Sequence, residues 1–167
     1  MSSLGRVWRF GDNIDTDVLA PGIYMKRPIT EMAAHCLEAV DPLFAKDVRP
    51  GDIVVAGRNF GMGSSREQAA QALLALGVTA ILAKSFGGIF YRNALNHGLL
   101  ALTCAGTDRI EAGDRLAIDG IKGEVVVERT GEHLACEPLP PHLLEMIKDG
   151  GLVAHLEKKL ARKRAGT

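Results

Sequence analysis

The sequence has no excess of charge of either sign and no long hydrophobic run. Its 167 residues include 20 Lys and Arg against 20 Asp and Glu, so the formal net charge is zero. A nucleic-acid-binding protein normally carries a basic excess, and this balance therefore argues against a nucleic-acid partner. No apolar stretch is long enough to span a membrane, and the first residues lack a charged-then-apolar signal pattern. We therefore expect a cytoplasmic protein without a membrane partner.

Cysteine is also scarce. Cys36, Cys104 and Cys136 are widely separated, form no C-x-x-C pair and cannot all be joined in disulfides. Each is expected to be a small buried residue rather than a metal ligand. We therefore expect no metal cluster on this chain itself.

Acidic residues are concentrated in one short segment, where Asp12, Asp15 and Asp17 lie within six residues. The glycine and the distal Glu of a calcium-binding loop are missing. The segment therefore favours a loop of Asx turns and a helix cap over a metal site.

Apolar residues make up 47% of the chain and charged residues 24%, which is typical of one globular domain over residues 1–167. The apolar run 52–56, the Ala- and Leu-rich segment 67–76 and the apolar run 79–83 predict a strand–helix–strand unit with parallel strands. Further strands are expected at 6–10 and 99–104. Thr30 can cap a helix that continues to about Val40, and a helix before residue 99 should end at Gly98.

The second half of the chain changes character. Short strands are expected at 115–118, 124–128 and 134–136, separated by glycine-containing turns. They predict a small antiparallel region packed beside the first half. A helix should follow from Pro140 to about Lys148, and residues 157–167 are interpreted as a solvated, flexible basic tail. The predicted fold class is α/β, with a short parallel or mixed sheet, flanking helices and this small antiparallel region.

A glycine-rich loop at residues 57–66 joins the central strand to the following helix. Gly61 and Gly63 allow the backbone to approach a ligand closely, and Arg66 offers a planar fork for a carboxylate or a phosphate. Ser64 and Ser65 place hydroxyl groups beside that cation. The loop therefore predicts a small-anion site with a hydroxyl next to it.

A purely structural interpretation of the same loop also stands. Ser64 and Glu67 fit the S-x-x-E capping box, in which the serine side chain only caps the helix. The two interpretations are compatible, and the sequence does not choose between them. A phosphate-binding P-loop is excluded because the loop contains no lysine.

A connector at residues 20–28 carries Tyr24, Met25, Lys26 and Arg27. Pro28 keeps the preceding residue extended, so the segment is expected to be exposed. Its two cations are either a solvated basic pair or part of a lid that contacts an acidic substrate.

Five elements together resemble one family. The segments 12–17, 61–67 and 84–86, with Asn93 and the segment 98–100, are similar in content and order to the small subunits of 3-isopropylmalate dehydratases, within the aconitase superfamily. The resemblance covers nearly the whole chain, and Gly-Ser-Ser-Arg-Glu is its most specific element. It implies a swivelling β/β/α domain.

The resemblance also implies a partner and a reaction. A separate large subunit would hold a [4Fe–4S] cluster on its own cysteines, and the open iron would take the substrate hydroxyl as a Lewis acid. The family reaction dehydrates a 2-hydroxy di- or tricarboxylic acid and rehydrates it with the hydroxyl on the neighbouring carbon. This chain would be active only together with the large subunit.

The family motif implies individual roles as well. Ser64 would be the catalytic base, Ser65 and Arg66 would bind a substrate carboxylate, and Tyr24, Met25 and Lys26 lie where the family selects its substrate. Isopropylmalate enzymes tend to be apolar there, and Lys26 departs from that pattern. Homoaconitate, methylmalates and dimethylmalate therefore stay open as substrates, and a stand-alone anion-binding module is the non-enzymatic alternative.

Overall fold

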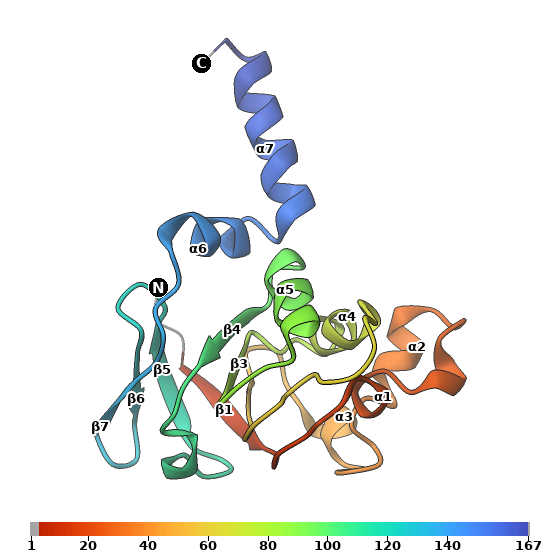
Figure 1. The fold of residues 1–167 in the computed structure, drawn as a ribbon, viewed down its shortest axis with the longest axis vertical. Helices are drawn as coiled ribbons and strands as arrows, with labels where there is room; N and C mark the ends of the chain where they lie inside the picture. The colour runs from red at the N-terminus through yellow and green to blue at the C-terminus, as the bar shows by residue number, and fades with distance from the viewer. Residues whose placement is uncertain (1–3, 167) are drawn as a thin grey trace.

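The computed structural model describes residues 4–166 and arranges them around a seven-stranded mixed sheet (Figure 1). The strands lie in the spatial order β4-β3-β2-β1-β5-β6-β7. Strands β1 to β4 pair in parallel, whereas β5 pairs antiparallel with both β1 and β6, and β7 pairs antiparallel with β6. The strands are β1 (Leu4–Arg9), β2 (Ile53–Val55), β3 (Ala80–Ala83), β4 (Leu100–Thr103), β5 (Arg115–Asp119), β6 (Glu124–Val127) and β7 (Glu132–Ala135).

Helices connect and flank the strands. Helix α4 links β2 to β3, and α5 links β3 to β4, which are the crossovers that parallel strands need. The helices are α1 (Thr16–Leu19), α2 (Ile29–Ala33), α3 (Phe44–Asp47), α4 (Gln68–Ala75), α5 (Gly88–Asn96), α6 (Pro141–Lys148) and α7 (Leu152–Arg164), with 3-10 turns η1 (Gly22–Tyr24) and η2 (Thr107–Arg109).

The parallel half of the sheet is the centre of the hydrophobic core. Every residue of β2 and β3 is buried, because helices and loops cover both faces of these strands. Strands β5 and β6 instead alternate buried and less buried residues, as expected where only one face is covered. At the edge of the core, the ring of Phe44 packs edge-on against Trp8 and Phe10, with ring centroids 5.3 and 5.4 Å away.

The structure confirms the predicted strand–helix–strand unit and the predicted α/β class. It differs in how the antiparallel region is attached. The predicted separate region is the continuation of the same sheet, because β1 pairs with β2 on one side and with β5 on the other. The last strand also begins at Glu132, two residues earlier than the sequence predicts.

The predicted helix from Thr30 to Val40 is wrong. Helix α2 begins at Ile29 and ends at Ala33, and the chain then continues in turns. Leu37 has a φ of 61° and is fully buried, and its N–H donates to the carbonyl of Val18 at 3.0 Å. A left-handed residue ends helical geometry, so the contact with the α1 segment outweighs the local helical pattern. Val40, predicted on the buried face, is 50% exposed.

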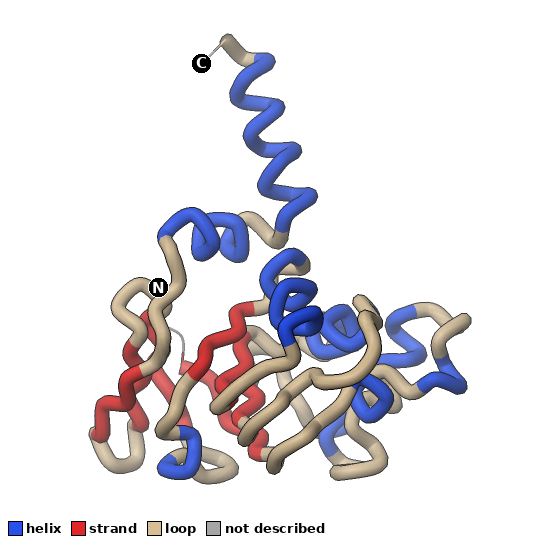
Figure 2. The backbone as a smooth tube through the Cα atoms, in the orientation of Figure 1, coloured by secondary structure: helices blue, strands red, loops and turns tan. Residues whose placement is uncertain are grey.

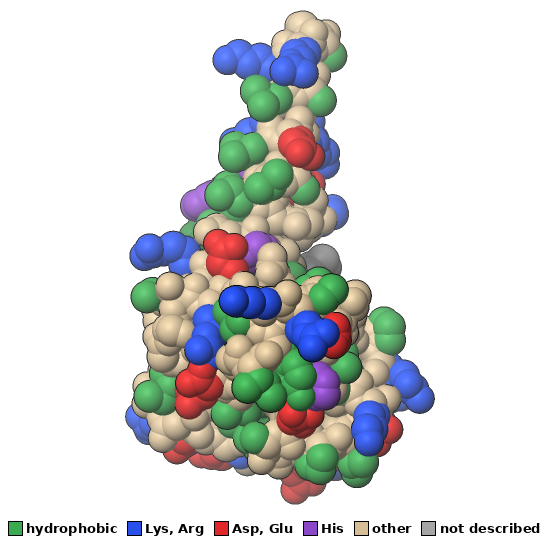
Figure 3. Space-filling model, turned by 90° about the vertical axis from the view of Figure 1, so that its right-hand side faces the viewer, with side chains coloured by type: hydrophobic (Ala, Val, Ile, Leu, Met, Phe, Trp, Pro, Cys, Tyr) green, Lys and Arg blue, Asp and Glu red, His purple; other side chains and the backbone are tan. Residues whose placement is uncertain are grey.

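Helix α7 projects away from the sheet and contains most of the predicted basic tail (Figure 1). Residues 157–164 are helical, residue 167 lies outside the described residues, and the flexibility of the tail stays a prediction. Figure 3 shows hydrophobic and basic side chains along this helix. Val153, Leu156 and Leu160 are exposed hydrophobic residues of α7. Within residues 4–166, no helix is long and apolar enough to cross a membrane.

Candidate functional site at the ends of the parallel strands

Three loops meet where the parallel strands end. They follow β1, β2 and β3 and run side by side toward α1, α4 and α5, as the tan segments of Figure 2 show. Single β-bridges join the first loop to the second at Asp15 and Met62, and the second to the third at Phe60 and Phe86. Ligand sites of α/β proteins typically lie outside the carboxyl ends of parallel strands, so this edge is the natural place for a site.

Backbone hydrogen bonds hold the first two loops together. Asn13 donates to the carbonyl of Arg58 at 2.8 Å, and Thr16 donates to the carbonyl of Met62 at 2.9 Å. The Asp12 carboxylate also accepts the N–H of Arg58 at 2.7 Å. The glycine-rich loop therefore has a defined shape that depends on the acidic segment before it.

Glycine is required where the second loop crosses the aromatic residues beneath it. Gly61 has a φ of 80°, and a side-chain carbon there would overlap the ring of Phe90. Phe90 packs against Phe60, with ring centroids 5.4 Å apart, and stacks near Phe86 at 6.4 Å. The buried rings of Phe60 and Phe90 and the partly buried ring of Phe86 form the packed layer under the loop.

The capping-box interpretation of Ser64 is wrong. Helix α4 begins at Gln68, and its N-cap residue Glu67 makes no side-chain capping bond. Gly63 has a φ of 108°, and the next residues remain non-helical, so Ser64 lies four residues before the first helical position. Its exposed hydroxyl instead forms a hydrogen bond of 3.3 Å with the hydroxyl of Thr16.

Arg66 links the glycine-rich loop to α1. Its guanidinium pairs with the Asp17 carboxylate and donates to the carbonyl of Ala20 at 3.2 Å. The Arg66 side chain is 24% exposed, whereas that of Asp17 is 68% exposed. Both bonds use the same nitrogen, and a guanidinium carries five N–H donors, so the rest of the fork can serve a ligand. Ser65 lies exposed beside it.

The connector 20–28 reaches the site through its first part only. Gly22, where η1 begins, lies next to the Arg66 guanidinium. Tyr24 stacks on the ring of His35 at a centroid distance of 3.9 Å, Met25 packs against the core, and Lys26 is exposed to solvent. The structure thus brings this segment beside Arg66, and the substrate-selecting role of its side chains stays a prediction.

Two polar residues of the site were not singled out as site residues from the sequence. Thr16 is only 2% exposed, yet its hydroxyl faces Ser64, and Asp17 pairs with Arg66. The sequence flagged this acidic segment as a helix cap, and that prediction is confirmed, because Asp15 accepts the N–H of Val18 at 2.9 Å. The pairings with the glycine-rich loop span nearly 50 residues, and no local pattern reveals them.

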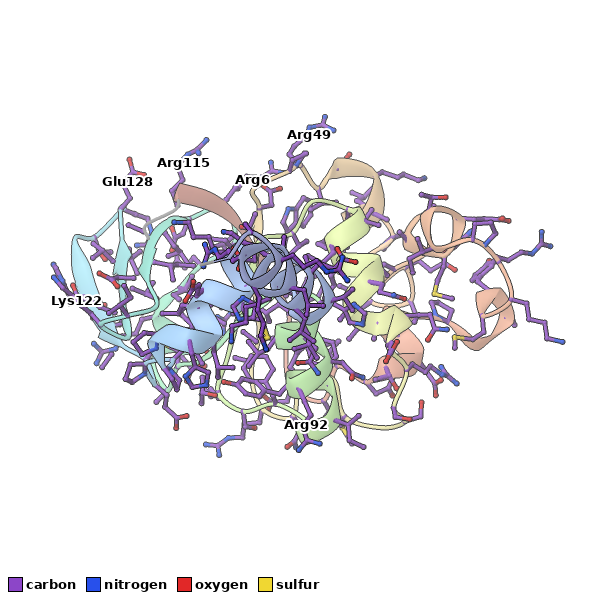
Figure 4. The ribbon with its side chains drawn as sticks, turned by 90° about the horizontal axis from the view of Figure 1, so that it is seen from above. Arg6, Arg49, Arg92, Arg115, Lys122 and Glu128 are labelled. Carbon is purple, nitrogen blue, oxygen red and sulfur yellow. The ribbon has the colours of Figure 1, made fainter. Side chains whose placement is uncertain are left out.

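A second group of arginines lies elsewhere. Arg6 and Arg115 are cross-strand partners on β1 and β5, and with Arg49 they line a hollow of about 320 Å³. Figure 4 shows these three on one side of the molecule and Arg92 of α5 on the opposite side. Asp52, at 3.4 Å from the Arg6 guanidinium, is the carboxylate in this hollow. The lining contains no hydroxyl or thiol side chain, so the combination of hydroxyl and arginine distinguishes the Ser64 site.

No group of three or more His, Cys, Asp or Glu residues that could hold a metal ion occurs within the described part of the chain. Cys36, Cys104 and Cys136 are free thiols, and the first two are buried. The described residues therefore do not fit an iron–sulfur cluster, and we derive no cluster chemistry from this chain.

Comparison with known proteins identifies relatives over nearly the full length. A model of the aconitase C-terminal domain matches residues 18–107, which include β2 to β4 and the glycine-rich loop. A 3-isopropylmalate dehydratase small subunit from Syntrophus aciditrophicus is 48% identical over 161 residues, covering 95% of this chain and 98% of the relative. A methanogen homoaconitase small subunit from Methanothermobacter thermautotrophicus is 47% identical over 159 residues, covering 93% and 91%.

Among solved structures, a 3-isopropylmalate dehydratase from Methanocaldococcus jannaschii superimposes with a TM-score of 0.93 at 42% identity, and the match covers 100% of both chains. The fold described above is therefore shared with a relative of known structure, and the match covers the whole chain.

Proposed function

The chain belongs to the family of 3-isopropylmalate dehydratase small subunits, within the aconitase C-terminal domain family, and from this we propose that it is the small subunit of a hydro-lyase. The proposed enzyme interconverts 2-isopropylmalate and 3-isopropylmalate by dehydration and rehydration, in leucine biosynthesis. The observation that carries the proposal is that one loop presents both the Ser64 hydroxyl and the Arg66 guanidinium.

We assign the proton-transfer role to Ser64. Its Oγ would remove a proton from the substrate carbon and later return one, and its hydrogen bond with Thr16 fixes the position of that oxygen. A serine is a weak base in water, because its alkoxide is unstable there. The Arg66 guanidinium and other donors aimed at that oxygen would stabilise the charged form, because exclusion of water by itself disfavours it.

Arg66 and Ser65 are assigned to a substrate carboxylate. Asp17 and the carbonyl of Ala20 fix one side of the guanidinium, so its free N–H groups are oriented before the substrate arrives. Preorientation of a planar fork favours bidentate carboxylate binding.

The site needs a partner surface. Ser64 and Ser65 are exposed, and the apolar side chains of Met62 and Ile89 nearby are 41% and 51% exposed. Exposed apolar groups around a polar site are typical of a surface that another protein covers. We assign this role to a large subunit, which would hold the [4Fe–4S] cluster that this chain's described residues do not fit.

One observation favours a second candidate substrate. Lys26 is an exposed cation on the connector whose first residues lie beside Arg66, and a relative of comparable identity is named a homoaconitase small subunit. A lysine can pair with an additional carboxylate, although less exactingly than an arginine. Homoaconitate, and likewise methylmalates or dimethylmalate, therefore stay as alternative substrates.

The test is turnover after anaerobic reconstitution with a large subunit of this family. We expect no turnover by the chain alone and robust turnover of 2-isopropylmalate by the complex, with homoaconitate and dimethylmalate as matched comparisons. Preference for homoaconitate would move the assignment to the second candidate. Turnover by the chain alone, or tight citrate binding by the chain with no activation of any large subunit, would contradict the proposal and favour an anion-binding module.

A further inference from the structure

Two cysteines face each other where the sheet curls back on itself. Strands β4 and β7 are the two ends of the strand order, yet Cys104, which follows β4, pairs with Cys136, which follows β7, in an isolated antiparallel bridge. This bridge joins the two ends of the sheet at one corner of the molecule.

The hydrogen-bond pattern defines the geometry of the pair. Glu137 donates its N–H to the carbonyl of Thr103 at 2.8 Å, one residue away on each side of the bridge. This places Cys104 and Cys136 in a non-hydrogen-bonded pair, where the Cα atoms are about 4.5 Å apart and the side chains are closest. Disulfides form across Cα distances of about 4.4–6.8 Å, so the bridge can take one without moving the backbone.

The side chains and their environment agree with this register. The Cys104 thiol donates to the carbonyl of Ala135, the neighbour of Cys136, at 3.6 Å. A hydrogen bond from the Cys136 side chain lowers the pKa of Cys104 against the opposing effect of burial, while the same hydrogen bond raises the pKa of Cys136. The pairing therefore favours the thiolate form of Cys104, and the thiolate is the reactive form of a cysteine.

The pair is accessible to solvent on one side, unlike the third cysteine. Cys136 is partly exposed and Cys104 is buried, so a small oxidant can reach the pair from solvent at Cys136. Cys36 is fully buried, and burial raises the pKa of its thiol, so it is expected to stay inert under the same conditions.

We propose that Cys104 and Cys136 form a redox modification site, in which a peroxide converts the two thiols into a disulfide that joins the ends of the sheet. A thiolate of the pair attacks one peroxide oxygen, and the O–O bond breaks to give a sulfenic acid and a hydroxide, which takes up the proton that this thiol lost on ionisation. The other thiol then attacks the sulfenic sulfur, the S–S bond forms, and water leaves. The two thiols lose two electrons in total, and hydrogen peroxide is reduced to two waters.

The disulfide should stabilise the fold measurably. It would close a loop of about 30 residues, for which restriction of the unfolded chain predicts an increase in the melting temperature of roughly 10 °C for a protein of this size. The Cα separation of about 4.5 Å expected for this type of pair lies within the range of disulfides, so the disulfide should carry little strain.

The experiment treats the full chain with hydrogen peroxide at pH 7 and then alkylates it under denaturing conditions. We expect two of the three thiols to disappear, a mass decrease of about 2 Da from the loss of two hydrogens, and a peptide linking Cys104 to Cys136. The melting temperature should rise by roughly 10 °C without reductant and return with dithiothreitol. Cys36→Ala is the matched control and should form the same disulfide, with the same rise in melting temperature relative to its own reduced form, whereas Cys136→Ser should form no disulfide.

Three results would overturn the proposal. Retention of all three thiols would show that the pair does not oxidise. A disulfide involving Cys36, or one between two chains, would assign the reactivity elsewhere. A disulfide that forms but leaves the melting temperature unchanged or lowered would show that the folded sheet does not hold the pair in the required geometry. Cys104→Ser alters a buried side chain and could prevent folding. The test therefore uses Cys136→Ser, because Cys136 is more exposed and its replacement should leave the fold intact.

Discussion

Replacement of Arg66 by lysine separates the ligand-binding role of this side chain from its structural one. The guanidinium contacts the Asp17 carboxylate and the carbonyl of Ala20, and its remaining N–H groups are assigned to the substrate. A lysine keeps the positive charge but offers a single ammonium group. It cannot hold these two partners and a bidentate carboxylate at once.

The two roles predict effects of different size. The Asp17 side chain is 68% exposed, so losing or weakening the ion pair should cost less than about 1 kcal/mol of unfolding free energy. Losing one charged hydrogen bond to the substrate should cost about 1.5–3 kcal/mol. Each 1.4 kcal/mol of lost transition-state binding lowers kcat/KM tenfold. Arg66→Lys should therefore lower kcat/KM about 10- to 100-fold while the protein remains folded.

The assay measures kcat/KM of the reconstituted complex alongside urea unfolding of the isolated chain. Arg58→Lys, the same substitution in the same loop, is the control and should leave both quantities unchanged. If Arg66→Lys keeps kcat/KM within about twofold of the wild type, the assignment of the free N–H groups to the substrate is wrong.

Three further predictions follow from the same structure. Gly61→Ala should lower the unfolding free energy by about 2–5 kcal/mol, through a strained positive φ and overlap with Phe90, and a loss below 1 kcal/mol in urea unfolding would contradict this. Lys26→Val should leave isopropylmalate turnover intact but reduce homoaconitate turnover at least about tenfold, and equal effects on both substrates would exclude a selective role. Arg129 holds the pKa of Asp114 below its usual value of 3.8, so Asp114→Asn should lower the unfolding free energy above about pH 4. The difference in unfolding free energy between the variant and the wild type should shrink as the pH falls through the lowered pKa. A pH-independent difference in urea unfolding would count against this pairing.

The parallel half of the fold was predictable because its signals are local. Strands β2 and β3 are short apolar runs, and glycines follow α4 and α5. Fully buried strands must be apolar along their whole length, so the sequence itself records their position.

The errors occur where long-range contacts override local patterns. The apolar periodicity after Thr30 indicated a continuous helix, but burial of Leu37 against Val18 imposes a left-handed turn. Ser64 matched a capping box, but the bonds of its loop to the acidic segment keep the chain non-helical through Arg66. No pattern within a short window can weigh such contacts against helix propensity.

The candidate site was predictable in part. The sequence motif and the family resemblance proposed Ser64, Ser65 and Arg66, because glycines, serines and an arginine at a strand–helix junction are a local signal, and the roles of these residues stay predictions. Thr16 and Asp17 lie at the candidate site because they pair with residues far along the chain, and only the structure shows these pairings.

The most direct test of the central claim is the turnover of Ser64→Ala in the reconstituted complex. The Ser64 hydroxyl caps no helix but pairs with the buried Thr16 hydroxyl, so the substitution should lower the unfolding free energy by about 1–3 kcal/mol and leave assembly with the large subunit intact. If Ser64 supplies the base, kcat should fall by about two orders of magnitude or more. A variant that assembles normally and keeps kcat within a few-fold of the wild type would contradict the account.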